Sequence, residues 1–301
     1  MGIAIFGSIN MDLVVRAAHI PAPGETILGS DFVTVPGGKG ANQAVAVAQL
    51  GGAATMIGAV GDDAFGDTLR ASLQHYGVNV AHVQRIQWSS GVALITIDER
   101  GQNSIVVASG ANMRMSSAIL DSVDHTLAQS SHLLCQLEIP YELVIAAMQL
   151  AKRRGVITIL DPAPTHALPA EYYAAADIIT PNEQETLQLT GILPNDDANA
   201  RAAAQRLHER GATHVIIKRG AQGVLWSHAG QLLAVPAFNV AAVDTVAAGD
   251  CYNGALACAL ARGEEMPSAL RYAAAAAAIA VTRHGAQQAM PRHAEVMTLL
   301  G

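Results

Sequence analysis

Short apolar stretches alternate with longer helical patterns along this 301-residue chain, and that alternation constrains the fold more than any other feature. Patterns typical of strands buried on both faces occur at residues 3–6, 55–60, 133–137, 156–160, 178–180 and 215–218. Helical patterns occur at residues 41–50, 65–76, 143–154, 183–189 and 198–210. Strands that alternate with helices build right-handed βαβ units. The sequence therefore predicts an α/β fold with a doubly wound, mostly parallel sheet.

A second, smaller sheet is predicted from segments of a different texture. Residues 12–16 and 26–35 are rich in β-branched side chains, and a Pro-Ala-Pro-Gly run separates them. Residues 92–107 contain two alternating runs around the turn Glu99-Arg100-Gly101-Gln102, which indicates a hairpin. We expect segments of about 12–36 and 91–108 to form a small β-sheet lid on a single domain that spans residues 1–301.

Composition and charge exclude several classes of protein. The formal charge of −7 and the absence of a basic block argue against a nucleic-acid binder. Only three cysteines occur and none forms a Cys-x-x-Cys pair, which argues against a disulfide framework and a thiolate metal site. The first residues lack a basic leader, and the longest apolar segment, residues 273–281, is too short to span a membrane. We expect a cytoplasmic protein that binds neither nucleic acid nor membranes.

The segment 243–250 is the strongest candidate for a reactive site. It follows an extended run at 237–243 and precedes an apolar helical pattern at 252–261. Small residues at 247–249 let the backbone approach a ligand, and the free N–H groups of a helix start attract an anion. Asp250 lies at that point, where its carboxylate can take a proton from a hydroxyl that attacks the anion. The alternative is that Asp250 is an ordinary N-cap.

Asn10 and Asp12 are candidates for binding hydroxyl groups. They lie two residues apart, so in an extended segment their side chains share one side. An amide and a carboxylate together suit adjacent hydroxyls. Asn and Asp after a strand are also common turn residues, which is the competing explanation. Glu138 lies at the carboxyl end of the predicted strand 133–137, where α/β sheets bind their ligands.

Four motifs resemble those of one enzyme family. Residues 37–44 read Gly-Gly-Lys-Gly-Ala-Asn-Gln-Ala, residues 58–66 read Gly-Ala-Val-Gly-Asp-Asp-Ala-Phe-Gly, and residues 181–185 contain Asn-x-x-Glu. Residues 244–250 read Asp-Thr-Val-Ala-Ala-Gly-Asp. In this order, along nearly the whole chain, they are similar to the signatures of the ribokinase-like (PfkB) carbohydrate kinases, and most similar to those of its ribokinase branch. Many members of the family have Gly where this chain has Ala247.

The resemblance implies ATP-dependent phosphorylation of the 5-hydroxyl of D-ribose, giving D-ribose 5-phosphate and ADP. Asp250 would be the general base, and the amides of Ala247, Ala248 and Gly249 would hold the migrating phosphoryl group. The alternatives are a kinase of another pentose or nucleoside, such as 2-deoxyribose, and a non-catalytic sugar sensor. A sensor needs no base, so Asp250 favours an enzyme.

The resemblance also implies binding residues. Those for the sugar are Asn10, Asp12, Gly38, Lys39, Asn42, Glu138 and Asp250. Those for ATP are Asn182, Lys218, Arg219, Gly220, Ala221, Gln222, Gly223, Gly249, Asp250 and Ala274, with Glu185 holding Mg²⁺ through water. Those for an activating K⁺ are Asp244, Val246, Ala280, Arg283, Gly285 and Ala289.

Three of these assignments have simpler or conflicting explanations. Residues 218–223 are also compatible with a plain β-turn, and residues 282–285 with a frayed helix end. Ala289 departs from ribokinases that have a hydroxyl residue there. The Gly-Gly-Lys-Gly run is neither a P-loop nor a dinucleotide fingerprint, because the required spacing and flanking residues are missing. The family's lids interlock in pairs, so the resemblance also implies a homodimer formed through the lid.

Overall fold

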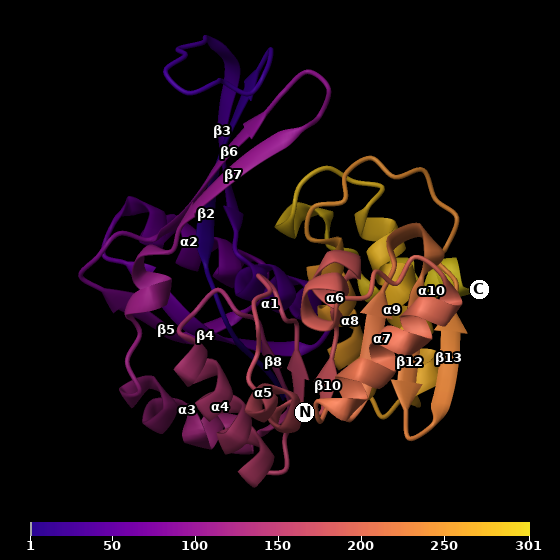
Figure 1. The fold of residues 1–301 in the computed structure, drawn as a ribbon. Coiled ribbons are helices and arrows are strands. Elements are labelled where there is room, and N and C mark those ends of the chain that lie inside the picture. The colour runs from indigo at the N-terminus through magenta and orange to yellow at the C-terminus, as the bar shows by residue number, and fades with distance from the viewer. Residues whose placement is uncertain (1) are drawn as a thin grey trace.

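A twisted nine-stranded sheet forms the body of the protein in the computed structural model, which describes residues 2–301 (Figure 1). Its order is β13-β12-β11-β10-β9-β8-β1-β4-β5. The strands are β1 (Gly2–Phe6), β4 (Ala53–Gly61), β5 (Asn79–Ile86), β8 (Ser130–Cys135), β9 (Ile157–Leu160), β10 (Ile178–Ile179), β11 (His214–Lys218), β12 (Val224–His228) and β13 (Gln231–Val235). All neighbours from β5 to β11 pair parallel, and β12 and β13 add an antiparallel edge.

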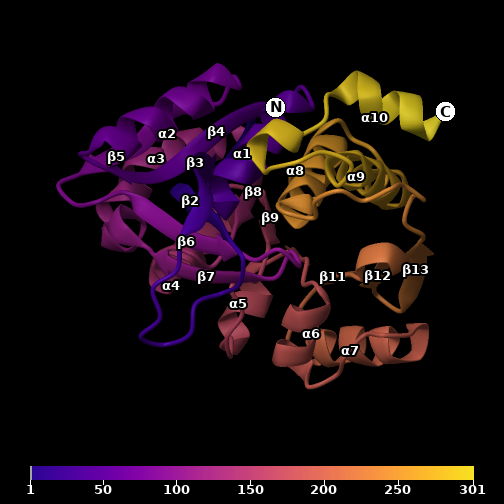
Figure 2. The same ribbon diagram turned by 90° about the horizontal axis from the view of Figure 1, so that it is seen from above.

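Helices cover both faces of this sheet and bury a separate apolar core on each side; in Figure 2, α8 and α9 lie on one side of β11–β13 and α6 and α7 on the other. One face carries α1 (Lys39–Gln49), α2 (Ala64–His75), α8 (Ala248–Ala261), α9 (Met266–Ala280) and α10 (His293–Leu300). The other carries α3 (Ala118–Ala128), α4 (Tyr141–Arg153), α5 (Ala170–Ala175), α6 (Glu183–Thr190) and α7 (Asp197–Glu209). In β1, Ile3 and Ile5 enter the first core, whereas Ala4 and Phe6 enter the second. An uninterrupted apolar run is what a strand covered on both faces requires, and the predicted α/β class is confirmed.

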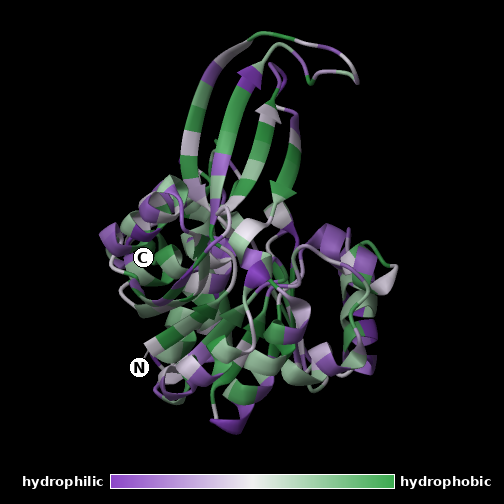
Figure 3. Ribbon diagram, turned by 90° about the vertical axis from the view of Figure 1, so that its left-hand side faces the viewer, coloured by the Kyte–Doolittle hydropathy of each residue, from purple (hydrophilic) through white to green (hydrophobic). Residues whose placement is uncertain are grey.

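A four-stranded sheet, here called the small sheet, projects from the body (Figures 1 and 3). It contains β3 (Gly29–Gly37), β2 (Asn10–Ala17), β6 (Gly91–Ile97) and β7 (Asn103–Ala108), in that spatial order. Its strands are mainly apolar in Figure 3. Because β2 begins four residues after β1 ends, the root of the small sheet lies beside the carboxyl ends of the parallel strands. The segments predicted to form a separate sheet do so.

Three sequence predictions differ from the structure. Residues 237–243 form no strand; after β13 the chain leaves the sheet, and Ala237, Phe238, Val240 and Ala242 line a cavity instead. The helix expected from residue 252 begins at Ala248, so Asp250 lies within its first turn. Strands β5, β12 and β13 were not predicted. β5 and β13 are the two edge strands of the sheet, where half-exposed patterns give a weak signal. β12 is the neighbour of β13, and its first four residues are buried.

Short elements complete the structure. They are the 3₁₀ helices η1 (Gly110–Arg114), η2 (Gly220–Gln222) and η3 (Gln287–Ala289). Within residues 2–301, none of the helices has both the length and the apolar character needed to cross a membrane.

Candidate active site

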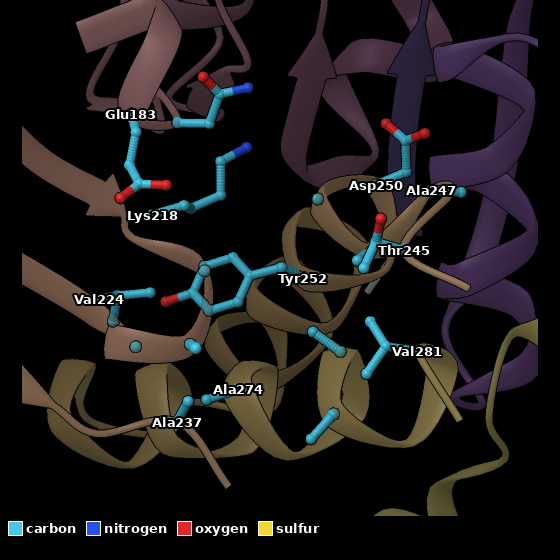
Figure 4. A pocket seen from close by; sticks show the side chains of 18 of the residues that line it. Glu183, Lys218, Val224, Ala237, Thr245, Ala247, Asp250, Tyr252, Ala274 and Val281 are labelled. Carbon is cyan, nitrogen blue, oxygen red and sulfur yellow. The ribbon is translucent and has the colours of Figure 1, made fainter. Parts of the chain in front are cut away.

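A cavity of about 670 Å³ opens at the carboxyl ends of the central strands, the place where α/β sheets bind ligands. Figure 4 shows Lys218 and Glu183 on one side of it and Asp250, Ala247 and Thr245 on the other. Residues from every ATP-binding motif proposed from the sequence line it. These are Asn182, Glu185, Lys218, Gly220, Ala221, Gly223, Ala247, Ala248, Gly249, Asp250 and Ala274. The fold thus brings together segments up to about ninety residues apart in sequence.

The first turn of α8 points its backbone amides at this cavity. Ala247, the N-cap, has φ 57°, a left-handed conformation that is uncommon for a residue with a side chain. The first α-helical bond runs from Cys251 N–H to the Ala247 carbonyl, and Ala248 N–H makes only a long 3.3 Å contact with the Thr245 carbonyl. The amides of Gly249 and Asp250 precede that first helical bond. The turn therefore offers N–H donors to an anion.

Two side-chain amides from α1 hold the carboxylate of Asp250. Asn42 Nδ2 donates to Oδ2 at 3.0 Å, and Gln43 Nε2 donates to Oδ1 at 3.2 Å. Asp250 is only 5% exposed. Burial raises its pKa to about 6, against the lowering effect of Lys39 and these two amides. The carboxylate is thus ionised at neutral pH and is a stronger base than a solvated Asp.

The residues proposed to bind sugar converge on residues 37–42, at the start of α1. Glu138 accepts from the backbone N–H of Lys39 at 3.3 Å and from the Ser8 hydroxyl. A Cβ on Gly37 would lie 2.4 Å from Asp12 Oδ2, and one on Gly38, where φ is 90°, would lie 2.7 Å from Asn10 N. Together with the Asn42–Asp250 bond, these contacts collect all seven proposed sugar residues around one helix start.

Four carboxylates, those of Asp12, Glu138, Asp161 and Asp250, surround the ammonium of Lys39 in this region. Burial, and then the charges of Glu138 and Asp250, raise the pKa of Asp12 to about 7. Burial alone would lower the pKa of the Lys39 ammonium, but the carboxylates Asp250, Asp161 and Glu138 raise it above its usual range. A permanently charged Lys39 therefore lies among these carboxylates. Such a concentration of buried carboxylates next to one cation is typical of a functional site, because buried charges of this kind contribute little to folding stability.

Elsewhere in the cavity, Lys218 at the end of β11 is held by Asp161, which follows β9. Lys218 Nζ donates to Asp161 Oδ1 at 2.9 Å, and both side chains are largely buried. A Cβ on Gly249 would lie 3.4 Å from the same Nζ, so the ammonium is close to the amides of α8. Gln43 Nε2 also donates to Asp161 Oδ2 at 3.2 Å. Gln43 therefore links Asp161 to Asp250.

Asp161 and Gln43 were not singled out from the sequence. Asp161 directly follows a predicted strand, and this position alone would have justified naming it as a candidate site residue. Gln43 belongs to the Gly-Gly-Lys-Gly-Ala-Asn-Gln-Ala run, but its partners Asp161 and Asp250 lie more than 100 residues away along the chain.

Asn182 and Glu185 form a reciprocal capping box at the start of α6. Asn182 Oδ1 accepts from Glu185 N–H at 2.9 Å, and Glu185 Oε2 accepts from Asn182 N–H at 2.7 Å. Burial and the charge of Asp161 raise the pKa of Glu185, although Lys218 opposes them. The motif thus has a structural role in addition to any ligand role. No group of three potential metal-binding side chains occurs within residues 2–301.

Two residues assigned to ATP from the sequence turn their side chains away from the cavity. Arg219 is buried and donates to Asp197 Oδ1 of α7 at 2.7 Å and to Gln222 Oε1 at 3.3 Å. Gln222 Nε2 donates to the Asn195 carbonyl. These contacts stabilise the turn whose glycines, Gly220 and Gly223, line the cavity. The side chains of Arg219 and Gln222 point elsewhere, so they are not available to a ligand in the cavity.

The inner part of the cavity is apolar and was largely missed by sequence reasoning. Only Ala274 was proposed for it, and the structure adds Val224, Ala237, Phe238, Val240, Ala242, Tyr252, Ala277, Ala278 and Val281. Most of these are small residues, which leave room for a flat, apolar group such as a nucleobase. Their side chains carry no chemistry that a sequence motif could have revealed.

The segments proposed to hold K⁺ lie side by side. Asp244 Oδ1 accepts from Val246 N–H and Oδ2 from Gly285 N–H, both at 3.0 Å. Asp244 N–H in turn donates to the Val281 carbonyl at 3.1 Å. Each carboxylate oxygen of Asp244 thus accepts one backbone hydrogen bond, and the two bonds hold the segments 244–246 and 285 together. Of the remaining proposed ligands, Ala280 ends α9, Arg283 bonds Glu295, and Ala289 is buried in η3.

Comparison with known proteins agrees with this arrangement. The model of the pfkB family of carbohydrate kinases matches residues 2–293. The chain belongs to this family. A ribokinase of Haemophilus influenzae is 40% identical over 99% of this chain and 98% of its own, and a deoxyribokinase of Salmonella typhi is 36% identical over 97% and 96%. The structure of Arabidopsis thaliana ribokinase complexed with ribose and ATP superposes with a TM-score of 0.93 at 32% identity, covering 99% and 98%.

In this family member, the raised pKa of Asp12 makes folding stability depend on pH. Between about pH 4 and pH 7 the folded chain keeps a proton that the unfolded chain has lost, so the free energy of unfolding falls as pH rises. Asp12→Asn removes this effect while keeping the shape of the side chain. We expect the free energy of unfolding of the variant, relative to that of the wild type, to rise by about 1.4 kcal/mol per pH unit from pH 5 to pH 7. Urea unfolding measures both values. A gap that stays constant with pH would contradict the buried, repelled state of Asp12.

Proposed function

We propose that the protein transfers the γ-phosphoryl group of ATP to the 5-hydroxyl of D-ribose. The observation that carries this proposal is the position of Asp250. Its buried carboxylate lies between a cluster of hydroxyl-binding groups at the start of α1 and a cavity lined by backbone amides and Lys218. The related ribokinases support the choice of ribose, and the similar deoxyribokinase makes 2-deoxyribose the main competing substrate.

In this proposal the chain's residues hold both reactants and move one proton. Asn10, Asp12, Lys39, Asn42 and Glu138 would fix the sugar, and Asp250 would take the proton of its primary hydroxyl. The oxygen then forms a bond to the γ-phosphorus as the bond to the ADP oxygen breaks. The amides at the start of α8 and the Lys218 ammonium would stabilise the charge on the equatorial oxygens, since phosphoryl transfer depends mainly on positioning and electrostatics.

Two cations complete the proposal. Glu185, with Asn182 beside it, would hold Mg²⁺ through water, and the ion would supply positive charge that offsets the charge of the phosphates. K⁺ would bind the backbone carbonyls of the segments that Asp244 joins, directly behind the amides of α8. A cation there would strengthen the positive potential at those amides. The contacts of Asp244 support this placement because they bring the two loops together.

The small sheet would act as the lid of the sugar site. Asp12 pairs with Ala93 and Ala93 with Val107, while Val14 pairs with Ile95 and Ile95 with Ile105. Directly paired residues share a face, so Ile105 lies on the same face as Asp12. Ile105 is 52% exposed. Exposed apolar side chains on a sheet with open edges favour association, and we propose a homodimer in which two such faces meet.

We also propose that the protein works in the cytoplasm. Its three cysteines, Cys135, Cys251 and Cys258, are free and buried, and burial raises the pKa of each thiol. Unpaired, unreactive thiols fit a reducing compartment.

Replacing the proposed base tests the mechanism. We expect Asp250→Asn to lower kcat by at least about 10²-fold, because a positioned base contributes about 10²–10⁴-fold. Ribose binding, measured by calorimetry, should persist because the amide keeps the shape of the side chain. Asp121→Asn, a charge change at an exposed position of α3, is the control and should keep full activity. An active Asp250→Asn enzyme would remove Asp250 from the mechanism.

A substrate panel tests the activity itself. ADP release is measured with D-ribose, 2-deoxyribose, fructose and adenosine, each with K⁺ and with Na⁺ at equal ionic strength. We expect the highest kcat/KM with D-ribose and K⁺, because a missing hydroxyl leaves buried polar partners unpaired. A higher value with 2-deoxyribose would establish the competing substrate. Binding of sugar without any ADP release would indicate a sensor, and equal rates in both salts would remove the K⁺ site.

The dimer is tested by two neighbouring substitutions on β7. Ile105 lies on the face of Asp12, and Val106 lies on the opposite face, with 62% of it exposed. We expect the wild type to have twice the 31.2 kDa mass of the chain in light scattering. Ile105→Glu should give monomers because it buries a charge in the interface, and Val106→Glu should remain dimeric. A monomeric wild type, or dissociation only with Val106→Glu, would refute this interface.

A further inference from the structure

Asn112 lies at the root of the small sheet, and no motif or comparison draws attention to it. It belongs to η1, which directly follows β7, and it is 1% exposed. Its side-chain amide makes three hydrogen bonds to the segment that leads into β2. Ile9 N–H donates to Asn112 Oδ1 at 3.0 Å, and Asn112 Nδ2 donates to the Ile9 carbonyl at 3.1 Å and to Asn10 Oδ1 at 2.7 Å.

The backbone of Ile9 determines which way the Asn112 amide faces. A backbone N–H can only donate and a carbonyl can only accept, so Asn112 must turn its oxygen to the first and its nitrogen to the second. The same nitrogen then has its second hydrogen directed at Asn10. The orientation of Asn112 is therefore set by two fixed groups and not by Asn10.

The hydrogen bond from Asn112 determines the orientation of the Asn10 amide. Only an oxygen can accept from Asn112 Nδ2, so the oxygen of Asn10 is turned inward and its Nδ2 is left for another partner. The space around the pair is closed, because a Cβ on Gly91 would lie 2.2 Å from Asn10 Oδ1 and 2.3 Å from Asn112 Nδ2. Asn10 Nδ2 makes no hydrogen bond within the described chain.

We propose that Asn112 is a positioning residue that fixes the Asn10 amide so that its nitrogen donates to a hydroxyl of the sugar. This inference rests on the proposed function, since it concerns the same sugar site. Asn10 then offers a donor and Asp12, two residues along β2, offers acceptors. A neighbouring pair of sugar hydroxyls can accept from the first and donate to the second. If Asn10 were reversed, two sets of acceptors would face the sugar.

A double-mutant cycle separates this role from a purely structural one. The variants are Asn10→Ala, Asn112→Asp and the double variant, and ribose affinity is measured by calorimetry. The carboxylate of Asn112→Asp still accepts from Ile9 N–H but can donate neither to the Ile9 carbonyl nor to Asn10. The Asn10 amide should therefore turn its nitrogen toward the new carboxylate. We expect each single variant to bind ribose about tenfold more weakly, in line with one lost or reversed hydrogen bond. In the Asn10→Ala background, Asn112→Asp should add less than a twofold change.

The same variants give a KM-against-kcat comparison. The side chain of Asn10 bonds Asn112, whereas the carboxylate of the proposed base Asp250 bonds Asn42 and Gln43. We therefore expect KM for ribose to rise with little change in kcat and none in KM for ATP. Val123→Ala should create a cavity in the core beside α3, on the opposite face of the main sheet from α1. This variant controls for effects on KM that arise from reduced stability alone. It should lower the unfolding temperature without changing KM for ribose. Independent, additive effects of Asn10→Ala and Asn112→Asp would overturn the proposal.

Hydrogen exchange of the side-chain amides tests the orientation without any sugar. In the free wild type, the Asn112 NH₂ group should be protected and the Asn10 NH₂ group should exchange faster. In Asn112→Asp, the Asn10 NH₂ group should become protected because it now donates inward. If the wild type binds no pentose, the proposed function fails, while this exchange pattern still decides the positioning role. A protected Asn10 NH₂ group in the free wild type would overturn it.

Discussion

The close contact between α1 and α8 is the constraint on which the site depends. A Cβ on Gly254 of α8 would lie 2.7 Å from the Cβ of Ala46 and 3.0 Å from the Gln43 carbonyl. Only small residues permit this approach, and it brings Asn42 and Gln43 within hydrogen-bond distance of Asp250. An ionised carboxylate is costly to bury unless such donors meet it. The small alanine and glycine residues of these helices are therefore required by the buried carboxylate of Asp250 as well as by packing.

The conformation of Ala247 shows where the chain accepts strain. A left-handed residue with a side chain costs roughly 1–2 kcal/mol relative to the ordinary helical conformation, and φ at Ala247 is 57°. In return, the turn directs the following amides into the cavity before α8 begins. Asp244 holds the preceding residues in place through its two bonds to backbone N–H groups. The strained conformation of Ala247 persists because these surrounding contacts hold the segment in place.

The sequence revealed the parts of the molecule whose signals are local. Periodicity located the buried strands, and small residues before Asp250 indicated a ligand loop. It did not reveal contacts made across long separations, such as Gln43 with Asp161 and Asp250 or Asn112 with Asn10, which span 102 to 207 residues. Nor did it indicate that residues 237–243 leave the sheet, because apolar residues that line a cavity look like those of a strand. The Asn182–Glu185 motif was recognised in the sequence, but only the structure shows that the two residues cap α6.

The small sheet differs in character between its root and its outer strands, and this follows from its register. At the root, Asn10 pairs with Gly37 and with Gly91, where added side chains would collide with Asp12, Asn10 and Asn112. Polar contacts and tight packing thus fix the root. Farther out, all six residues of β7 are exposed and largely apolar. Their burial stabilises the protein only when another surface covers them. The small sheet is therefore fixed at its root, and its exposed apolar side chains can add stability only if another surface packs against them.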